Sequence, residues 1–391
     1  WLTTGFLPPG PGKHGECLES VPTCKYTEDV FLDKRRLRRV GSVSTVTADT
    51  VYADYRTNTI TIGDDPRRHL MEQAVAPSLV RSTVDDVTVA NLVLEQAANE
   101  AQVGAVENRQ VTPHKAGSGW RILDNEVRLN HGAGIGFADA STVTGNFIHH
   151  QGQLGFGAWG AGSVVSNNEV SFNGAAGYSP EWEAGGCKIW MTERQTVTKN
   201  YVHDNFGPGL WADGGNIDTT YEYNKITDNW GAGIQHEISY DAAIRHNEIS
   251  GNGRRHKGWA WEAGIQIQSS GGITLIEIAY NVVKGNANGI TLIDSGGRAL
   301  NRPVPHGPHV VQNVWVHDNT ITMSAGETTG AVQDTGDRRI YTSNHNRFEA
   351  DRYLHSLTDP VFSWADTNMG LEPLAQPRRR QRSQRPGRTE R

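Results

Sequence analysis

Short apolar stretches separated by Asn and Gly recur along the middle of the chain. In each unit an Asn is followed by one or two apolar residues, a second Asn five positions after the first, and then a Gly-plus-apolar pair. The first Asn of the unit stands at positions 125, 146, 168, 200, 224, 247 and 281, so the steps are 21, 22, 32, 24, 23 and 34 residues. A self-similar pattern with a period of this length indicates a solenoid of stacked structural repeats.

Each unit has room for two or three strands of three to five residues and for no amphipathic helix. Gly and Asn tolerate the left-handed backbone that tight corners require. A leucine-rich repeat would need Leu at strand positions where this chain has Ile, Val, Phe and Gly. The pattern therefore predicts an all-β fold, a right-handed parallel β-helix, with a ladder of hydrogen-bonded Asn side chains at one corner. The ladder should contain Asn125, Asn146, Asn168, Asn200, Asn224 and Asn247.

Four segments carry a family resemblance: NEVRLNHGAGI, NYVHDNFGPGLW, NKITDNWGAGI and NEISGNG. On these the chain resembles the right-handed β-helix repeat proteins of the pectate-lyase-like superfamily, over roughly residues 85 to 325. The resemblance implies the fold. It leaves the activity open, because that superfamily includes polysaccharide lyases, glycoside hydrolases, epimerases and non-catalytic members, so function has to be argued from the site.

The regions outside the repeat divide the chain into four parts. We expect an extended segment over 1–28, a cap with irregular strands over 29–85, the β-helix over 86–370, and a disordered tail over 371–391, because a bare coil end needs a cap and the tail has no periodic apolar residue. Residues 377–391 hold seven Arg and one Glu, which leaves the body acidic within a total formal charge of −6. An acidic body speaks against nucleic-acid binding, and no apolar run is long enough to cross a membrane.

Cysteine usage favours a secreted protein. Cys17 and Cys24 lie close together in a Gly- and Pro-rich start and can close a small disulfide loop, whereas Cys187 stands at a strand position and is expected to be a buried thiol. A start at Trp1 without Met is compatible with a signal peptide already removed. We expect an extracellular monomer.

Two steps of the repeat are about ten residues too long, and both extra segments end in Trp-Glu-Ala-Gly. These are Trp182–Gly185 and Trp261–Gly264. Insertions in a solenoid gather as loops on one face, and loops three coils apart would flank a groove about 14 Å wide at a strand spacing of about 4.8 Å. The groove is wide enough for a short run of sugar rings.

Strand alternation predicts what lines the floor of this groove. If Cys187, Leu210, Ile234, Ile265 and Ile290 point inward, their neighbours point outward. The outward set is Lys188, Trp190, Trp211, Asp213, Gln235, Glu237, Gln266 and Gln268. Carboxylates, amides and indoles are the groups that a saccharide needs, so we take Trp182, Trp190, Trp211, Gln235, Trp261, Gln266 and Gln268 as candidate substrate-binding residues.

Asp213 and Glu237 are the leading catalytic candidates. They occupy equivalent positions in adjacent coils, which predicts carboxyl groups about 5 to 6 Å apart, near the separation of a retaining glycosidase pair. If the loop that carries Glu183 or Glu262 folds over the groove, that glutamate takes the catalytic role of Asp213 or of Glu237. The competing interpretation is that Asp213 caps the turn after it and that Glu237 only lines the strand edge.

A polysaccharide lyase would use the same residues differently. Lys188 or a His would abstract a proton, and Ca²⁺ held by Asp213, Asn216 and Glu237 would neutralise a uronate. No other metal or cofactor is indicated, and the His residues lack the spacing of a zinc site, so we interpret them, His236 included, as structural. The sequence thus predicts a carbohydrate-active enzyme on a polysaccharide or oligosaccharide, with a hydrolase favoured over a lyase. The alternative is a non-catalytic glycan-binding or structural module, and convergence of the acids between the two loops is the discriminating feature.

Overall fold

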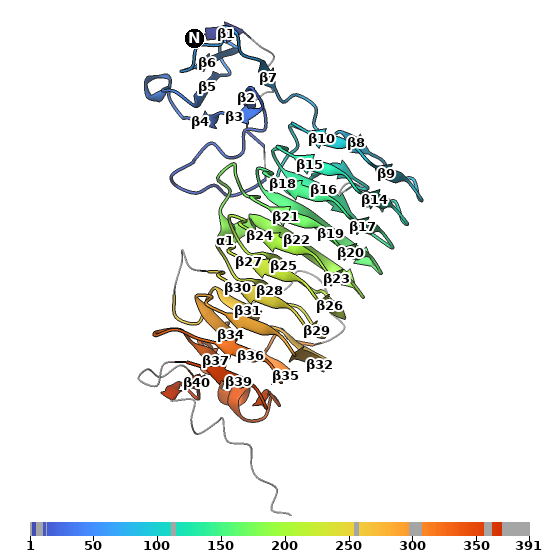
Figure 1. The fold of residues 1–391 in the computed structure, drawn as a ribbon, viewed down its shortest axis with the longest axis vertical. Coiled ribbons are helices and arrows are strands. Elements are labelled where there is room, and N and C mark those ends of the chain that lie inside the picture. Colours follow the sequence, from blue (N-terminus) through green and yellow to red (C-terminus); the bar gives the residue numbers. More distant parts are fainter. Residues whose placement is uncertain are drawn as a thin grey trace, which may run out of the picture.

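The computed structural model is a stack of coils whose strands form three parallel sheets (Figure 1). It describes residues 2–4, 11–12, 14–110, 115–253, 258–296, 307–355 and 362–369. Each coil contributes one strand to each sheet in turn, and we number the sheets I, II and III in the order in which the chain visits them. The predicted parallel β-helix is confirmed.

Sheet I carries most of the longer strands. Within the described residues it has 12 strands: β8 (Val80–Arg81), β11 (Gly104–Glu107), β16 (Ala133–Phe137), β19 (Leu154–Ala161), β22 (Gly185–Glu193), β25 (Leu210–Asp213), β28 (Ile234–Glu237), β31 (Ala263–Gln268), β34 (Asn288–Asp294), β37 (Thr329–Gln333), β40 (Phe362–Trp364) and β41 (Thr367–Met369). The last pair is antiparallel, β41 on β40, and it ends the sheet.

Most strands of sheets II and III have three or four residues. Sheet II is β9 (Thr88–Ala90), β14 (Arg121–Leu123), β17 (Thr142–Thr144), β20 (Val164–Ser166), β23 (Thr196–Thr198), β26 (Thr219–Glu222), β29 (Ala242–Arg245), β32 (Gly271–Ala279), β35 (Gln312–His317) and β38 (Arg347–Glu349). Sheet III is β10 (Val93–Glu95), β15 (Glu126–Arg128), β18 (Phe147–His149), β21 (Glu169–Ser171), β24 (Tyr201–His203), β27 (Lys225–Thr227), β30 (Glu248–Ser250), β33 (Val282–Lys284), β36 (Thr320–Thr322) and β39 (Arg352–Leu354).

Two amide ladders hold the corners. At the corner between sheets II and III, Asn125 donates to Asn146 at 3.0 Å, and the chain of side-chain bonds continues through Asn168, Asn200, Asn224, Asn247, Asn281 and Asn319. The predicted ladder is therefore confirmed and extends farther. A second ladder, through Asn205, Asn229, Asn252 and Asn286, lines the corner between sheets III and I.

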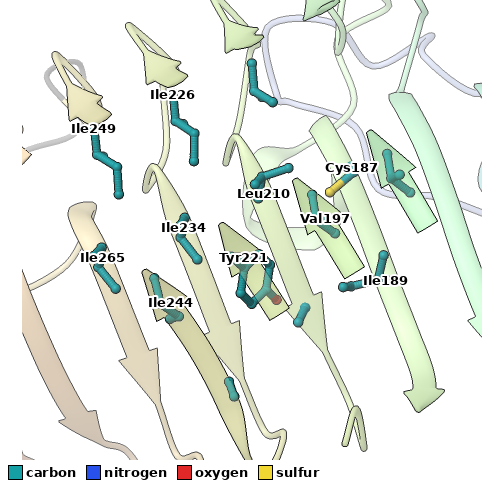
Figure 2. Close-up of a cluster of buried hydrophobic side chains, with 14 of the residues drawn as sticks. Cys187, Ile189, Val197, Leu210, Tyr221, Ile226, Ile234, Ile244, Ile249 and Ile265 are labelled. Atoms are coloured by element: carbon teal, nitrogen blue, oxygen red, sulfur yellow. The ribbon is translucent and has the colours of Figure 1, made fainter. Parts of the chain in front are cut away.

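Apolar side chains fill the space between the sheets (Figure 2). Cys187, Leu210, Ile234, Ile265 and Ile290 are all buried in this core, as the alternation predicted. Leu210, Ile234, Ile265 and Ile290 stand in register as one column of sheet I. Fixing this column inward forces the alternate residues of the same strands outward.

The N-terminal part forms two small sheets with a core of its own. One contains β1 (Leu2–Thr4), β4 (Arg38–Arg39), β5 (Thr50–Asp54) and β6 (Thr59–Ile62), and the other β2 (Val30–Leu32), β3 (Arg35–Arg36) and β7 (Met71–Gln73). Short elements elsewhere are β12 (Arg109–Gln110), β13 (Lys115–Ala116), α1 (Pro180–Glu183) and two 3-10 turns (Val43–Thr45, Arg338–Tyr341). Parallel pairing of the solenoid starts at β8, a few residues before the expected start at 86.

A disulfide joins Cys17 to Cys24, and Cys187 is a buried free thiol, so both cysteine predictions are confirmed. No helix among the described residues has the length and apolar character needed to cross a membrane. The predicted tail over 371–391 lies outside the described residues.

Candidate functional site

Outward side chains from three adjacent strands of sheet I meet in one cluster. Lys188 comes from β22, Trp211 and Asp213 from β25, and Gln235 and Glu237 from β28. Trp211 stands in register with Gln235, and Asp213 with Glu237. Because neighbouring strands lie about 4.8 Å apart, the register places Asp213 and Glu237 on neighbouring strands at equivalent positions of the outer face.

Lys188 is the cation at the centre of the cluster. Its ammonium lies 2.7 Å from Asp213 Oδ2, forms a second ion pair with Glu183, and sits 4.6 Å from the centre of the Trp211 ring. Burial lowers the pKa of Lys188, but the negative charges of Asp213 and Glu183 outweigh it and raise that pKa above its ordinary value. The lysine is therefore held protonated, and one ammonium joins two carboxylates.

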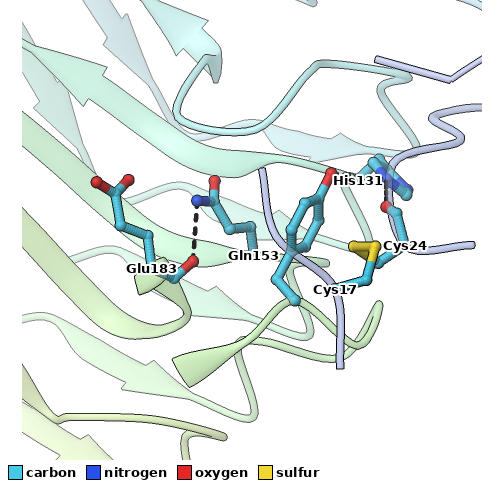
Figure 3. The surroundings of a disulfide bond; sticks show 6 residues. Cys17, Cys24, His131, Gln153 and Glu183 are labelled. Carbon is cyan, nitrogen blue, oxygen red and sulfur yellow. Dashed lines mark hydrogen bonds between the residues drawn. A yellow bond between two sulfur atoms is a disulfide. The ribbon is translucent and has the colours of Figure 1, made fainter. Parts of the chain in front are cut away.

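Glu183 reaches the cluster from the first Trp-Glu-Ala-Gly insertion. The insertion contains α1, with Pro180 in its first turn, and the N-terminal segment fixes it: Ser179 N–H donates to Glu16 O at 2.9 Å. Gln153 Nε2 donates to the Glu183 carbonyl at 2.9 Å, close to the disulfide loop (Figure 3). Burial raises the pKa of the Glu183 carboxyl, and the nearby Asp213 charge adds to this, while Lys188 opposes it.

Two donors fix the Glu237 carboxylate. Trp211 Nε1 donates to Glu237 Oε2 at 3.0 Å, and Gln235 Nε2 donates to the same oxygen at 2.8 Å. Glu237 is 3% exposed and Asp213 keeps 19% of its side chain exposed, so Asp213 is the more accessible of the two. The prediction that the two acids pair on adjacent coils agrees with this register, whereas their catalytic role stays a prediction.

Trp211 differs from the sequence-based expectation. It was expected to offer an open ring to a sugar, but it is 4% exposed, with the Lys188 ammonium over its face and its N–H bonded to Glu237. Gln266 and Gln268 also point outward yet are each 2% exposed. Alternation predicts the direction of a side chain and not what covers it. The other expected sugar contacts, Trp182, Trp190, Trp261 and Gln235, are partly exposed.

Glu262 lies on the second insertion, directly before β31 of sheet I. Its backbone N–H donates to Gln266 Oε1 at 2.9 Å. Burial raises the pKa of Glu262 to about 7, and the charge of Glu181 on the first insertion adds to this rise. The structure thus brings Glu183, Asp213 and Glu237 together around Lys188 and Trp211, and it places Glu262 against Gln266.

The calcium ligand set expected for a lyase does not fit. Asn216 is buried, its Oδ1 accepts from Thr192, and its Nδ2 donates to Ser239, so its side chain is committed to the turn. The Lys188 ammonium already stands at the Asp213 carboxylate, where a cation would have to bind. Among the described residues no group of three His, Cys, Asp or Glu is arranged to hold a metal ion.

His236 faces the interior, as expected for a structural residue. Its Nε2 lies 2.9 Å from Tyr240 O, and burial lowers the pKa of its imidazole to about 4. Gln102 was missed by the sequence analysis. Its Nε2 donates to Glu183 Oε2, and its Oε1 lies 2.6 Å from His14 Nε2. It stands in an early coil, 81 residues before its partner, with no local motif that marks it.

Comparison with known proteins identifies the family. The family model described as "Right handed beta helix region" matches residues 114–276 and 218–321, which together cover more than half of the chain. The chain belongs to the right-handed β-helix family. Comparison with curated protein sequences finds no match.

Solved structures of the same outline share little sequence with this β-helix protein. One titled "The complex structure of XylC with xylose" is 14% identical, with a TM-score of 0.53 over 91% of this chain and 71% of that one. The Azotobacter vinelandii mannuronan C-5 epimerase AlgE6 A-module is 18% identical, with a TM-score of 0.47 over 74% and 76%. At 14% identity the likeness to the XylC structure is one of fold.

Proposed function

We propose that this protein is a glycoside hydrolase that cleaves a neutral polysaccharide or oligosaccharide with retention of configuration, using Asp213 and Glu237. The observation that carries the proposal is their in-register pairing on adjacent strands of the outer face. One strand spacing of about 4.8 Å is close to the carboxyl separation of about 5 to 5.5 Å in retaining glycosidases.

Asp213 is proposed as the nucleophile. A nucleophilic carboxylate attacks through its negative charge, and the Lys188 ammonium, 2.7 Å from Asp213 Oδ2, is the ion-pair partner of that charge. Asp213 also keeps part of its side chain exposed, which leaves it accessible to a sugar. Its carboxylate attacks the anomeric carbon, the bond from that carbon to the leaving oxygen breaks, and a glycosyl-enzyme ester forms.

Glu237 is proposed as the acid and base. In the first step it gives its proton to the leaving oxygen, and in the second it takes a proton from the water that hydrolyses the ester, so it ends as it began. The bonds from Trp211 and Gln235 hold the carboxyl in one orientation for both transfers. Glu183 is the second candidate for this role, because burial raises its pKa and it shares Lys188 with Asp213.

The charge of the cluster supports a neutral substrate. The Lys188 ammonium pairs with two carboxylates, Glu183 and Asp213, and Glu237 stands in register with Asp213, so a uronate would meet net negative charge. The same balance speaks against the lyase alternative, since a lysine whose pKa is raised is a poor base. A non-catalytic module has no need for three acids gathered in one cluster, two of them buried, so we favour an enzyme. A β-helix of similar outline carries xylose in the structure titled for XylC, which accords with a sugar ligand.

We also propose that the protein acts after secretion. The Cys17–Cys24 disulfide accords with an oxidising compartment, where polysaccharide substrates are found outside the cell.

The test is a panel of neutral polysaccharides and p-nitrophenyl glycosides, followed through new reducing ends and through absorbance near 235 nm. We expect reducing ends without a 235 nm product, and we expect Asp213→Asn and Glu237→Gln each to lower kcat by about a thousandfold or more. Glu349→Gln is the matched control, because Glu349 also accepts an indole hydrogen bond, from Trp315 on sheet II. A 235 nm product, or full activity in both carboxamide variants, would contradict the proposal.

Rescue of the variants by azide distinguishes the nucleophile from the acid and base. With an activated substrate and a nucleophile-deleted variant, azide attacks directly and gives a glycosyl azide of inverted configuration, whereas rescue of an acid/base variant gives the retained product. Asp213→Gly should therefore give the inverted azide and Glu237→Ala the retained one. If Glu183→Ala gives the retained azide and Glu237→Ala does not, Glu183 is the acid and base.

A further inference from the structure

A third insertion lies on the opposite edge of sheet I from α1. It connects β34 to β35, and the described end of it runs through Gly307 and His309. Tyr240 OH donates to Gly307 O at 2.8 Å, and the Tyr240 and His309 rings lie 4.9 Å apart. Tyr240 N–H in turn donates to Asn216 O at 2.8 Å.

These contacts place His309 beside the candidate site. Asn216 follows Asp213 by three residues, and Tyr240 follows Glu237 by three, so both stand just past the carboxyl ends of β25 and β28. The described end of this connection, at Gly307 and His309, therefore packs against Tyr240, just past the carboxyl end of β28. Asp213 acts electrostatically on the His309 imidazole, in keeping with this position.

The hydrogen bonds of Tyr240 define the tautomer of His309. The single Tyr240 hydroxyl proton is given to Gly307 O, so the hydroxyl accepts from His309 Nε2 at 3.4 Å. In a neutral imidazole with the proton on Nε2, Nδ1 carries the lone pair and is an acceptor. His309 thus presents an acceptor nitrogen.

This acceptor has no partner. His309 is 9% exposed, and Nδ1 has no hydrogen-bond partner among the described residues. Burial lowers the pKa of the imidazole although the Asp213 charge opposes it, which keeps the ring neutral near pH 7. A buried acceptor without a donor is costly, and its presence next to a site points to a donor supplied by a ligand.

We propose that His309 Nδ1 accepts a hydrogen bond from a hydroxyl group of the saccharide bound at Asp213, and that this contact selects for a sugar with a hydroxyl at that position. The inference rests on the proposed function for the identity of the ligand as a neutral saccharide. A hydroxyl is the donor that a neutral sugar presents in abundance. His309 would be a binding residue from a part of the chain far from the two acids in sequence.

The first experiment observes the nitrogen itself. Protein carrying Asp213→Asn and ¹⁵N-labelled histidine is titrated with xylohexaose and, separately, cellohexaose, and the imidazole nitrogens are followed by NMR. The His309 signals are assigned by their disappearance in His309→Leu. We expect the Nδ1 resonance to shift on saturation with the sugar that binds, while His236, whose ring faces the core, stays unchanged.

The second experiment measures affinity. His309→Leu, which removes the acceptor, should weaken the dissociation constant about tenfold, the equivalent of one hydrogen bond. His309→Asn, whose Oδ1 lies near the Nδ1 position, should stay within about threefold of the parent protein. Against a sugar that lacks the recognised hydroxyl, the parent and His309→Leu should bind equally. The melting temperature of each variant controls for folding, and His309→Asn keeps the test available if the leucine variant is unstable.

The outcomes separate the two proposals. Binding with a shift of Nδ1 but no hydrolysis by the unmodified protein overturns the proposed hydrolase and leaves the role of His309 standing. Hydrolysis that depends on Asp213, together with an unmoved Nδ1 signal or an undiminished affinity in His309→Leu, overturns the role of His309. Failure of both oligosaccharides to bind overturns it as well.

Discussion

Trp211 donates its indole hydrogen to Glu237 across one strand spacing, at 3.0 Å, with Lys188 over the face of its ring. An aromatic residue that the sequence marks as a sugar platform is thus a partner of the proposed acid. Trp211 acts through Glu237, and its proposed role is to position the carboxyl.

This relationship predicts the kinetics of Trp211→Phe. The ring volume is largely kept and the donor is lost, so we expect kcat to fall by about tenfold to a hundredfold with little change in KM, because proton transfer depends on carboxyl orientation. Steady-state kinetics on the best substrate of the panel measures the split. Trp315→Phe is the control, since Trp315 bonds to Glu349 on sheet II. A rise in KM with unchanged kcat would instead indicate that Trp211 binds the sugar.

Removing the cation from the cluster should make stability depend on pH. In Lys188→Met, Glu183 and Asp213 lose their ammonium. The pKa of the buried Glu183 carboxyl, which Lys188 opposes in the parent protein, then rises further. A carboxyl whose pKa is higher folded than unfolded favours the folded state while protonated, and this advantage is lost as the pH rises through the folded value. We expect the variant to lose about 3 to 5 kcal/mol in its free energy of unfolding at pH 8 and clearly less at pH 5.

Urea unfolding at the two pH values measures this effect. Lys225→Met is the control, because Lys225 lies at the same 4.6 Å from a ring centre, that of Tyr201, but is exposed. An equal loss at pH 5 and pH 8 would show that Lys188 contributes by packing alone.

The amide ladder should be costly to interrupt. Asn200 accepts from Asn168 and donates to Asn224 and to Val165 O, each at 3.0 Å, and it is 1% exposed. Asn200→Ala leaves several of these buried groups without partners, so we expect a loss of at least about 3 kcal/mol in the free energy of unfolding. Glu248→Ala, at an exposed position of β30, should change it by less than about 0.5 kcal/mol. Equal effects of the two substitutions would contradict a stabilising ladder.

Truncation before Leu371 should leave the melting temperature nearly unchanged. Residues 371–391 contain no periodic apolar residue able to add a coil, so ordering them has nothing to offset its entropy cost. Thermal unfolding of the two chain lengths measures this. A drop of many degrees would show that the segment packs on the solenoid.

The sequence predicts the fold because successive coils have the same types of residue at the same positions. Asn146 and Asn168 occupy the same corner position in successive coils, and Ile234 and Ile265 occupy the same core position. The period and the alternation therefore predict the ladder, the core and the outward direction of Asp213 and Glu237.

Other features depend on how the insertions fold, and no period constrains that. The partner of Glu183, Gln102, comes from an early coil, and His309 returns from a late one. Trp211 is buried, with the Lys188 ammonium over its ring, although the alternation directs its side chain outward. Such contacts join residues that are far apart along the chain, so the local spacing of residues does not predict them.

The solenoid also restricts which stereochemical course a carboxylate pair on one face can follow. Neighbouring strands have a fixed spacing, so two acids in equivalent positions stand about 4.8 Å apart on adjacent coils or about 9.6 Å apart when one coil lies between them. Separations between these two values do not occur. The first value falls near that of retaining enzymes and the second near the upper end of the inverting range of about 6.5 to 9.5 Å. Asp213 and Glu237 occupy neighbouring coils. Insertion of a single complete repeat between them would preserve every ladder and the core while converting a double-displacement geometry into one with room for a water molecule.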